Sequence, residues 1–161
     1  MKDTTLVIPI HPEKGILLGM KKRGFGKGRW NGFGGKLSEG ESIEQAAIRE
    51  LREEIGIHTK ELALKKVAEI TFVFPTKQEW SQRCHVYLVH SWAGQEQESE
   101  EMLPQWFQKS QIPFESMWPD DPLWLPHVLT GKFIKAEFCM KEDQNGFETY
   151  SLDMTDTDSI L

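Results

Sequence analysis

The sequence lacks any long apolar run. The first 15 residues contain a five-residue apolar stretch, and no segment approaches the roughly 18 consecutive apolar residues that a membrane-spanning helix needs. We therefore expect a soluble protein that is not exported and has no membrane partner. The cytoplasm is its expected compartment, with the nucleus and the mitochondrial matrix as further ones.

Cysteine is scarce. The 161 residues include two cysteines, Cys84 and Cys139, and each lies in an apolar, strand-like context without the spacing of a metal site. This pattern argues against a metal site, and a disulfide between the two is the less favoured alternative. Both residues are predicted to be reduced thiols in or near the core of an intracellular protein.

An excess of positive charge is also absent. With 19 Lys and Arg against 25 Asp and Glu, the net charge is −6, which argues against a sequence-independent grip on long nucleic acid. A small nucleotide is still allowed, because divalent cations can carry its phosphates into an acidic site. The basic cluster 21–23 either attracts such phosphates or marks an exposed strand end. The length and the lack of repeats indicate a single domain over residues 1–161, expected to be a monomer.

The elements follow from apolar periodicity and turn residues. A glycine-rich loop with six glycines occupies residues 24–35, and Pro9 predicts a bulge in the first strand. We predict strands at 4–10, 15–22, 62–74 and 83–92, a short strand within 104–114, and a hairpin of 132–140 with 147–154 around Asn145-Gly146. A short helix is predicted to begin near Pro119 or Pro122 and to stop at Gly131, and residues 155–161 are predicted to fray.

The clearest element is a helix between Ser42 and Gly56. Ser42 and Gln45 have the spacing of a capping box, and Gly56 is a C-terminal stop. An apolar stripe at every fourth position faces the core: Ile43, Ala47, Leu51 and Ile55.

Three glutamates lie together on this helix. Glu50, Glu53 and Glu54 project within about 100° of one another at the margin of the apolar stripe. Like charges at this spacing repel by a few tenths of a kcal/mol per pair, so a positive partner is expected. Oxygen ligands after a glycine-rich loop suit a hard cation such as Mg²⁺. The alternative is an exposed acidic face paired with lysines from elsewhere.

Residues 35–57 contain a complete family signature. Gly35 is followed after five residues by Glu41, and after seven more by Arg49-Glu50-Leu51, Glu53-Glu54, Gly56 and Ile57. This spacing resembles the Nudix box in full. The flanking segments "LLGMKKRGFGKGRWNGFGGK", "WFQKSQIPF" and "MWPDD" resemble the MutT-type Nudix hydrolases that act on oxidised purine nucleoside triphosphates. The resemblance implies an α/β fold, with an α/β/α sandwich around a mixed β-sheet.

The resemblance also implies a metal centre and a catalytic set. In the family the metal is held by a backbone carbonyl and by glutamates of the helix and a later loop, which here are Gly34, Glu50, Glu53, Glu54 and Glu101. Glu100 is an alternative to its neighbour. Mg²⁺ is the expected cofactor, with Mn²⁺ able to substitute. Glu53 is the preferred general base, because Arg49 lies four residues earlier and can orient it.

A substrate pocket is implied as well. Its residues are Thr5, Phe25, Asn31, Phe33, Gly34, Gly35, Lys36, Phe72, Phe74, Met102, Trp118, Pro119, Asp120, Asp121, Trp124 and Phe138, with Lys21 near the phosphates. Trp118 can stack on a purine, and two desolvated aspartates should share a proton. The alternatives are a helix N-terminus for the aspartates and plain core for the aromatics. Trp80 lines the site or lies exposed.

The expected function is hydrolysis of an oxidised purine nucleoside triphosphate to the monophosphate and pyrophosphate, which keeps damaged nucleotides out of DNA. Rival interpretations are a Nudix hydrolase acting on capped RNA, a dinucleoside polyphosphate or an inositol pyrophosphate, a Nudix-fold binding module without turnover, and an interaction protein whose acidic helix is only surface.

Overall fold

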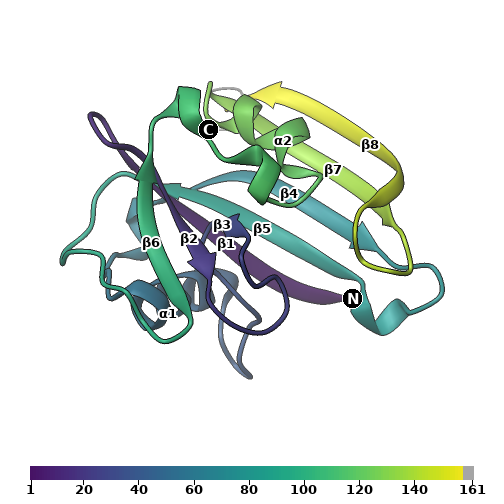
Figure 1. Cartoon of the computed structure of the whole chain (residues 1–161), viewed down its shortest axis with the longest axis horizontal. Coiled ribbons are helices and arrows are strands. Elements are labelled where there is room, and N and C mark those ends of the chain that lie inside the picture. Colours follow the sequence, from purple (N-terminus) through teal and green to yellow (C-terminus); the bar gives the residue numbers. More distant parts are fainter. Residues whose placement is uncertain (158–161) are drawn as a thin grey trace.

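A mixed eight-stranded sheet organises the chain (Figure 1). The computed structural model describes residues 1–157. The strands are β1 (Lys2–His11), β2 (Gly15–Lys21), β3 (Trp30–Asn31), β4 (Leu64–Val73), β5 (Gln82–Val89), β6 (Met102–Phe107), β7 (Lys132–Met140) and β8 (Phe147–Asp156). Their order is β3-β2-β1-β5-β4-β7-β8, with β6 paired to β2.

Strand directions bring distant segments to one edge of the sheet. β1 and β5 run parallel, β4 runs antiparallel to β5, and β7 runs parallel to β4. The first residues of β1 and β5 therefore lie level with the last residues of β4 and β7, as the pairs Lys2↔Gln82, Phe72↔Gln82 and Phe72↔Phe138 record.

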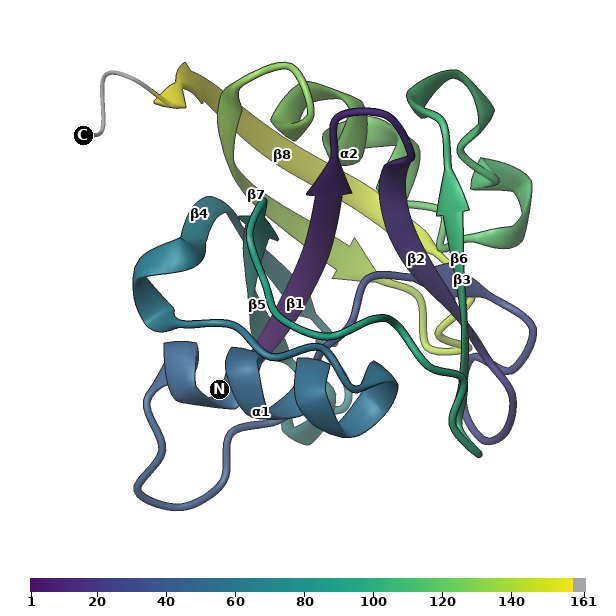
Figure 2. The same ribbon diagram turned by 90° about the vertical axis from the view of Figure 1, so that its left-hand side faces the viewer.

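The two α-helices cover opposite faces of the sheet, α1 (Ile43–Ile55) on one and α2 (Asp121–Val128) on the other (Figure 2). Alternation along β1 separates the two cores. Val7 packs with Leu51 in the α1 layer, whereas Leu6 and Ile8 pack with Trp124 in the α2 layer. This arrangement confirms the predicted α/β/α fold class.

Helix α1 forms for the local reasons read from the sequence. The Ser42 side chain accepts from the backbone N–H of Gln45, and the Gln45 side chain accepts from the backbone N–H of Ser42. Gly56 ends the helix with a φ of 75°. Ala47, Leu51 and Ile55 are buried beneath it. The predicted capping box and C-terminal stop are confirmed.

Three local predictions are wrong. Pro9 causes no bulge, and β1 keeps register with β5 from Lys2 to Pro9. Thr5 and Val7 donate to the segment at 33–35, so Pro9, two residues on, presents its nitrogen to that edge and not to β5. Helix α2 ends at Val128, before Gly131.

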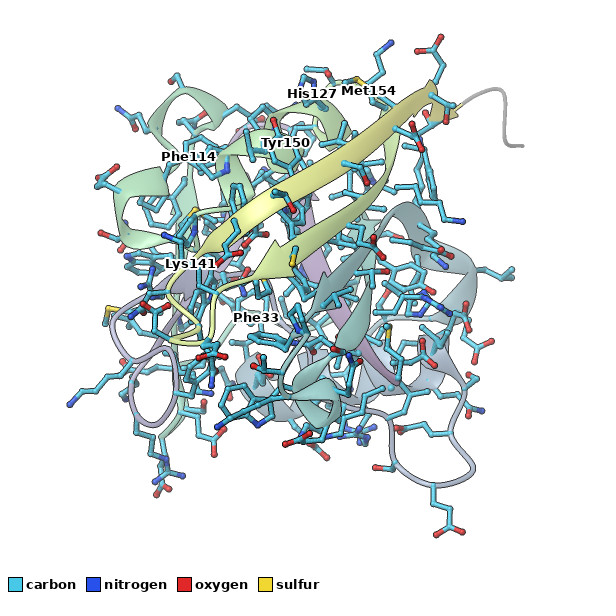
Figure 3. All side chains as sticks on the ribbon, turned by 90° about the vertical axis from the view of Figure 1, so that its right-hand side faces the viewer. Phe33, Phe114, His127, Lys141, Tyr150 and Met154 are labelled. Carbon is cyan, nitrogen blue, oxygen red and sulfur yellow. The ribbon has the colours of Figure 1, made fainter. Side chains whose placement is uncertain are left out.

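The predicted C-terminal hairpin is confirmed, because β7 pairs antiparallel with β8. Its tip is a loop over residues 141–146, in which Gln144 has a φ of 62°. The third wrong prediction concerns the end of the chain. β8 continues to Asp156, and the backbone N–H and the hydroxyl of Thr157 both donate to the Gly131 carbonyl, so residues 155–157 do not fray. The remaining residues of that prediction, 158–161, lie outside the described ones. Figure 3 shows Tyr150 and Met154 along β8, and both are exposed.

The predictions drawn from the lack of a long apolar run and from the two cysteines can be compared with the structure. Within residues 1–157, no helix has the length and apolar character needed to cross a membrane. Cys84 and Cys139 are both free thiols, as predicted. Burial raises the pKa of the Cys84 thiol to about 12, so this thiol stays protonated at neutral pH.

Candidate active site

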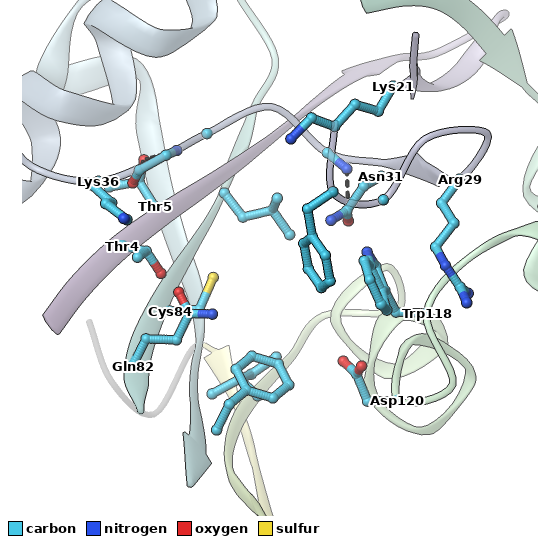
Figure 4. Close-up of a pocket in the computed structure, with 18 of the residues that line it drawn as sticks. Thr4, Thr5, Lys21, Arg29, Asn31, Lys36, Gln82, Cys84, Trp118 and Asp120 are labelled. Carbon is cyan, nitrogen blue, oxygen red and sulfur yellow. Dashed lines mark hydrogen bonds between the residues drawn. The ribbon is translucent and has the colours of Figure 1, made fainter. Parts of the chain in front are cut away.

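A cavity of about 690 Å³ opens where the strand ends meet (Figure 4). Its floor comes from the start of β1 and β5 and the end of β4, with Thr4, Cys84 and Phe72 among the lining residues. The loop after β2 and the segment before α2 form one wall, and helix α1 closes another side. The mixed strand directions therefore place residues from many distant parts of the chain around one space.

One end of the cavity holds the paired aspartates. Asp120 and Asp121 are 5% and 3% exposed. The Trp124 indole N–H donates to Asp120 Oδ2 over 2.9 Å, and the Trp118 backbone N–H donates to Asp121 Oδ2 over 2.9 Å. Burial raises the pKa of both carboxyls, and the charge of Asp120 raises that of Asp121 further. The pair therefore favours holding a proton.

Both aspartates lie at the N-terminus of α2, as the alternative interpretation expected, but the Asp120 side chain at the N-cap position makes no capping bond. It turns instead toward Trp124, one turn along the helix. The carboxyl of Asp121 bonds to Trp118, which precedes the helix. Neither side chain is used to satisfy the first N–H groups of α2.

Trp118 and Asn31 flank this end. Trp118 stacks against Phe25, with ring centroids 5.2 Å apart and planes 29° apart, and the Arg29 guanidinium lies 4.3 Å from the Trp118 ring centroid. The Asn31 side-chain oxygen accepts from the Gly32 N–H, which leaves its amide N–H groups for the cavity (Figure 4). The wall thus combines a flat aromatic surface with hydrogen-bonding groups suited to a planar heterocycle.

The opposite end is acidic. Glu50, Glu54 and Glu101 all line the cavity. Burial, followed by the charge of Glu50, raises the pKa of Glu54 to about 9, and Glu101 adds to the shift. Glu54 Oε2 is buried without a hydrogen-bond partner. A buried acceptor lacking a donor and surrounded by carboxylates is suited to a hard cation, because a cation would satisfy the oxygen and relieve the repulsion.

Glycines bring the backbone of this end close to strand and helix. Segment 33–35 pairs with the free edge of β1, where the Thr5 N–H donates to the Gly35 carbonyl over 2.9 Å. A Cβ on Gly34 would lie 1.7 Å from the Thr5 carbonyl oxygen, and one on Gly35 would lie 2.7 Å from Glu50 Oε1. Gly34 thus permits the strand pairing, and Gly35 leaves room for the carboxylate.

Arg49 bonds to the carboxylates of three glutamates near the cavity. Its guanidinium makes two bonds to Glu41, of 2.7 and 3.0 Å, and reaches Glu50 Oε1 at 2.9 Å and Glu53 Oε2 at 3.2 Å. It also donates to the Lys36 carbonyl at 3.0 Å. The Arg49 bond lowers the pKa of Glu41 to about 2. The principal partner of Arg49 is therefore Glu41, which sequence reasoning treated only as a box position.

Glu53 lies apart from the other helix glutamates. Its side chain is 53% exposed, bonds to Arg49, and does not line the cavity. Within residues 1–157, no three acidic or His and Cys side chains are close enough together to form a metal site as they stand. The arginine accounts for part of this spacing, since it draws Glu50 and Glu53 toward itself.

The three residues of the basic cluster 21–23 make two kinds of contact. Lys21 lines the cavity, whereas Lys22 pairs with Glu98 at 2.5 Å and Arg23 with Glu101 at 3.3 Å. The Lys22 N–H also donates to the Glu101 carbonyl over 2.8 Å. Lys22 and Arg23 thus hold the acidic loop that carries Glu101 beside the cavity.

Most of the implied pocket residues surround this one cavity, but three do not. Phe33, labelled in Figure 3, is fully buried in the α1 layer, Phe138 is buried in the α2 layer, and Pro119 lies outside the lining. Sequence reasoning missed Lys2, Thr4, Leu6, Gly26, Arg29, Gly32, Ile70, Gln82, Cys84, Met140 and Gln144, which line the cavity together with Trp80. Strand register brings many of them there, and no local signal in the sequence marks it.

Comparison with known proteins agrees with this geometry. A family model described as the NUDIX domain matches residues 1–128. The oxidized purine nucleoside triphosphate hydrolase of Mus musculus is 48% identical over 153 residues, covering 95% of each chain. The Danio rerio protein of the same name is 49% identical over 131 residues, covering 81% of each.

A solved structure supports the same conclusion. The mutator MutT protein of Bacillus halodurans superposes with a TM-score of 0.82 and 25% identity, covering 95% of this chain and 98% of its own. The chain belongs to the Nudix family, as the box at residues 35–57 predicts.

Proposed function

We propose that this Nudix hydrolase converts oxidised purine nucleoside triphosphates, such as 8-oxo-dGTP and 2-oxo-dATP, to the monophosphate and pyrophosphate. The observation that carries the proposal is one cavity with buried Asp120 and Asp121 at one end and Glu50, Glu54 and Glu101 at the other. The names of the mouse and zebrafish relatives point to the same substrates. Removing such triphosphates would keep mutagenic bases out of DNA.

The aspartates account for the choice of base. Oxidation at C8 of guanine converts N7 from an acceptor into an N–H donor. A carboxylate oxygen of Asp120 can accept from that donor, while unmodified dGTP would present one acceptor to another. Because one proton can move between Asp120 and Asp121, the pair can also donate, as a different oxidised purine would require. Trp118 supplies the stacking face and Asn31 the amide donors.

The acidic end suits the phosphates and Mg²⁺, which Mn²⁺ can replace. Glu50, Glu54, Glu101 and the Gly34 carbonyl would hold the cation, and the unsatisfied Glu54 Oε2 supports this assignment. When bound, the metal lowers the pKa of an attacking water and neutralises charge on the phosphates. Lys21 and Lys36 line the same cavity and supply further positive charge to the triphosphate.

Glu53 is proposed as the base that takes the proton of the attacking water. Arg49 holds the Glu53 carboxylate at 3.2 Å, which orients it, and its exposure leaves it open to water. Glu54 is the competing candidate, because it lines the cavity whereas Glu53 does not. Both candidates for the general base are therefore glutamates of α1.

We further propose that residues 1–161 act as one domain and as a monomer, without binding long nucleic acid, in keeping with the net charge of −6. Cytoplasm, nucleus and mitochondrial matrix are the proposed compartments, and the two free thiols are consistent with them.

The decisive assay is pyrophosphate release from 8-oxo-dGTP with and without Mg²⁺. Parallel reactions with 2-oxo-dATP, dGTP, capped RNA and a dinucleoside polyphosphate distinguish the substrate classes. Metal-dependent release that is fastest with the oxidised purines supports the proposal. Tight binding without turnover would indicate a binding module. If the protein neither binds nor hydrolyses these nucleotides, the acidic helix is only an exposed surface.

Two variants separate the base from the ligands. Glu53→Gln is expected to lower kcat by about 10² or more, the scale of a lost general base, at an unchanged Mg²⁺ half-saturation. Glu54→Gln is expected to raise the Mg²⁺ concentration required, because a ligand is lost. A folded Glu53→Gln protein with near-normal kcat would transfer the base assignment to Glu54.

A further inference from the structure

Arg29 contacts Trp118 from the end of the glycine-rich loop. Its guanidinium carbon lies 4.3 Å from the indole centroid, within cation–π range, and Nη1 donates to the Met117 carbonyl over 2.6 Å. One side chain therefore touches both the Trp118 ring and the backbone just before it. Figure 4 shows Arg29 beside Trp118, on the side away from the strand residues Gln82 and Cys84, and Arg29 itself lines the cavity.

The other contacts of Trp118 restrain its ring less. Asp121 accepts from the Trp118 backbone N–H, which fixes the backbone and leaves the indole free to turn. Phe25 stacks on the indole but is 64% exposed, and it sits between Gly24 and Gly26, which have φ values of 79° and 85°. Such a loop position is a weak support for a flat ring. Arg29, tied to the Met117 carbonyl, is the firmer one.

A fixed ring matters because stacking is favourable only if the ring need not be ordered first. Immobilising a side chain on binding costs free energy that a preorganised side chain has already lost in folding. Arginine is suited to this task, since its planar guanidinium stacks on an aromatic face while its N–H groups bond elsewhere.

We propose that Arg29 is a positioning residue that holds the Trp118 indole in the orientation that stacks on the purine base. This inference rests on the proposed function, because it takes Trp118 to be the surface on which the base lies. Arg29 acts through Trp118 and the Met117 carbonyl and makes no bond to the reacting phosphates.

The test is a double-mutant cycle with 8-oxo-dGTP. Arg29→Gln is expected to raise KM about ten-fold and to change kcat less than two-fold, given the strength of a cation–π contact and of a charged bond to a carbonyl. Arg29→Lys keeps the charge and should raise KM less. In a Trp118→Leu background, Arg29→Gln should add almost nothing, since the ring it positions is gone.

Binding of the product 8-oxo-dGMP, followed by tryptophan fluorescence, gives a readout without turnover. The wild-type ligand-induced change should shrink in Arg29→Gln. Lys27→Gln removes a positive charge from the same loop at an exposed position and serves as the control. Melting curves establish that each variant is folded, and Arg29→Lys carries the test if Arg29→Gln is not.

The outcomes are distinct. A ten-fold effect that persists in Trp118→Leu would mean that Arg29 attracts the substrate directly, and would overturn the proposal, as would a normal KM in both Arg29 variants. A wild-type protein that neither binds 8-oxo-dGMP nor hydrolyses 8-oxo-dGTP would instead refute the proposed function.

Discussion

Replacing Asp120 by Asn tests how the site reads the oxidised base. The Asn side-chain oxygen can still accept from the Trp124 indole N–H, which lies 2.9 Å from Asp120 Oδ2, so the fold should persist. The second oxygen becomes an NH₂ group, a fixed donor that cannot exchange a proton. With 8-oxo-dGTP this donor would face the N7–H donor of the base.

The magnitude follows from burial. Asp120 is 5% exposed, and an unmatched buried polar contact costs about 1–3 kcal/mol, which corresponds to roughly five- to 150-fold in kcat/KM. Wild-type preference for 8-oxo-dGTP over dGTP should lie in that range. Asp120→Asn should lose most of it through a slower reaction with 8-oxo-dGTP.

The assay is kcat/KM for both triphosphates, with pyrophosphate release as the signal. Asp121→Asn shows which member of the pair accepts from N7, and its melting temperature should not fall, because burial disfavours that carboxylate as an anion. Asp143→Asn, at an exposed position in the loop at 141–146, is the matched control. If both cavity variants keep the wild-type preference, the aspartates do not read the base.

Three further substitutions each follow from a single contact, and one more prediction concerns ligand binding. Gly35→Ala places a Cβ 2.7 Å from a flexible carboxylate oxygen and should raise the Mg²⁺ half-saturation in a folded protein, whereas Gly34→Ala meets the Thr5 carbonyl at 1.7 Å and should lower the melting temperature. Glu41→Gln should lower the melting temperature at pH 7. Because the pKa of Glu41 falls from 4.5 to about 2 on folding, wild type gains this stability above pH 4.5 and loses it as pH falls toward 2, where the two melting curves should converge. A constant gap would contradict that linkage. Saturating Mg²⁺ with 8-oxo-dGMP, at 100 times the dissociation constant, should raise the melting temperature by roughly 5–10 °C, and an unchanged curve would argue against the site.

Helix α1 and the family could be read from the sequence because their signals are local. A capping box, a stripe at every fourth residue and a terminal glycine specify a helix within 15 residues, and the Nudix box adds a spacing that chance seldom fills. The fold class follows from the family. The place of the active site, between a glycine-rich loop and an acidic helix face, follows as well.

Pairing between distant residues could not be read. The Glu41–Arg49 pair joins a loop to a helix, and Arg29 reaches Trp118 across 89 positions of the chain. Phe33 and Phe138 are aromatic, like other residues predicted for the pocket, but they are packed into the two cores. Strand register decides which face a side chain takes, and that register depends on contacts the local sequence does not contain.

The sequence by itself supplied the groups on which the proposed chemistry rests: helix glutamates proposed for a hard cation, paired aspartates and a tryptophan proposed for a purine, and the glycines that let them approach. Only the tertiary structure decided which carboxylates enter the cavity, since burial and Arg49 separate Glu54 from Glu53. The tertiary structure also raises the pKa of both aspartates. A pKa depends on desolvation, and desolvation is a property of the packed molecule.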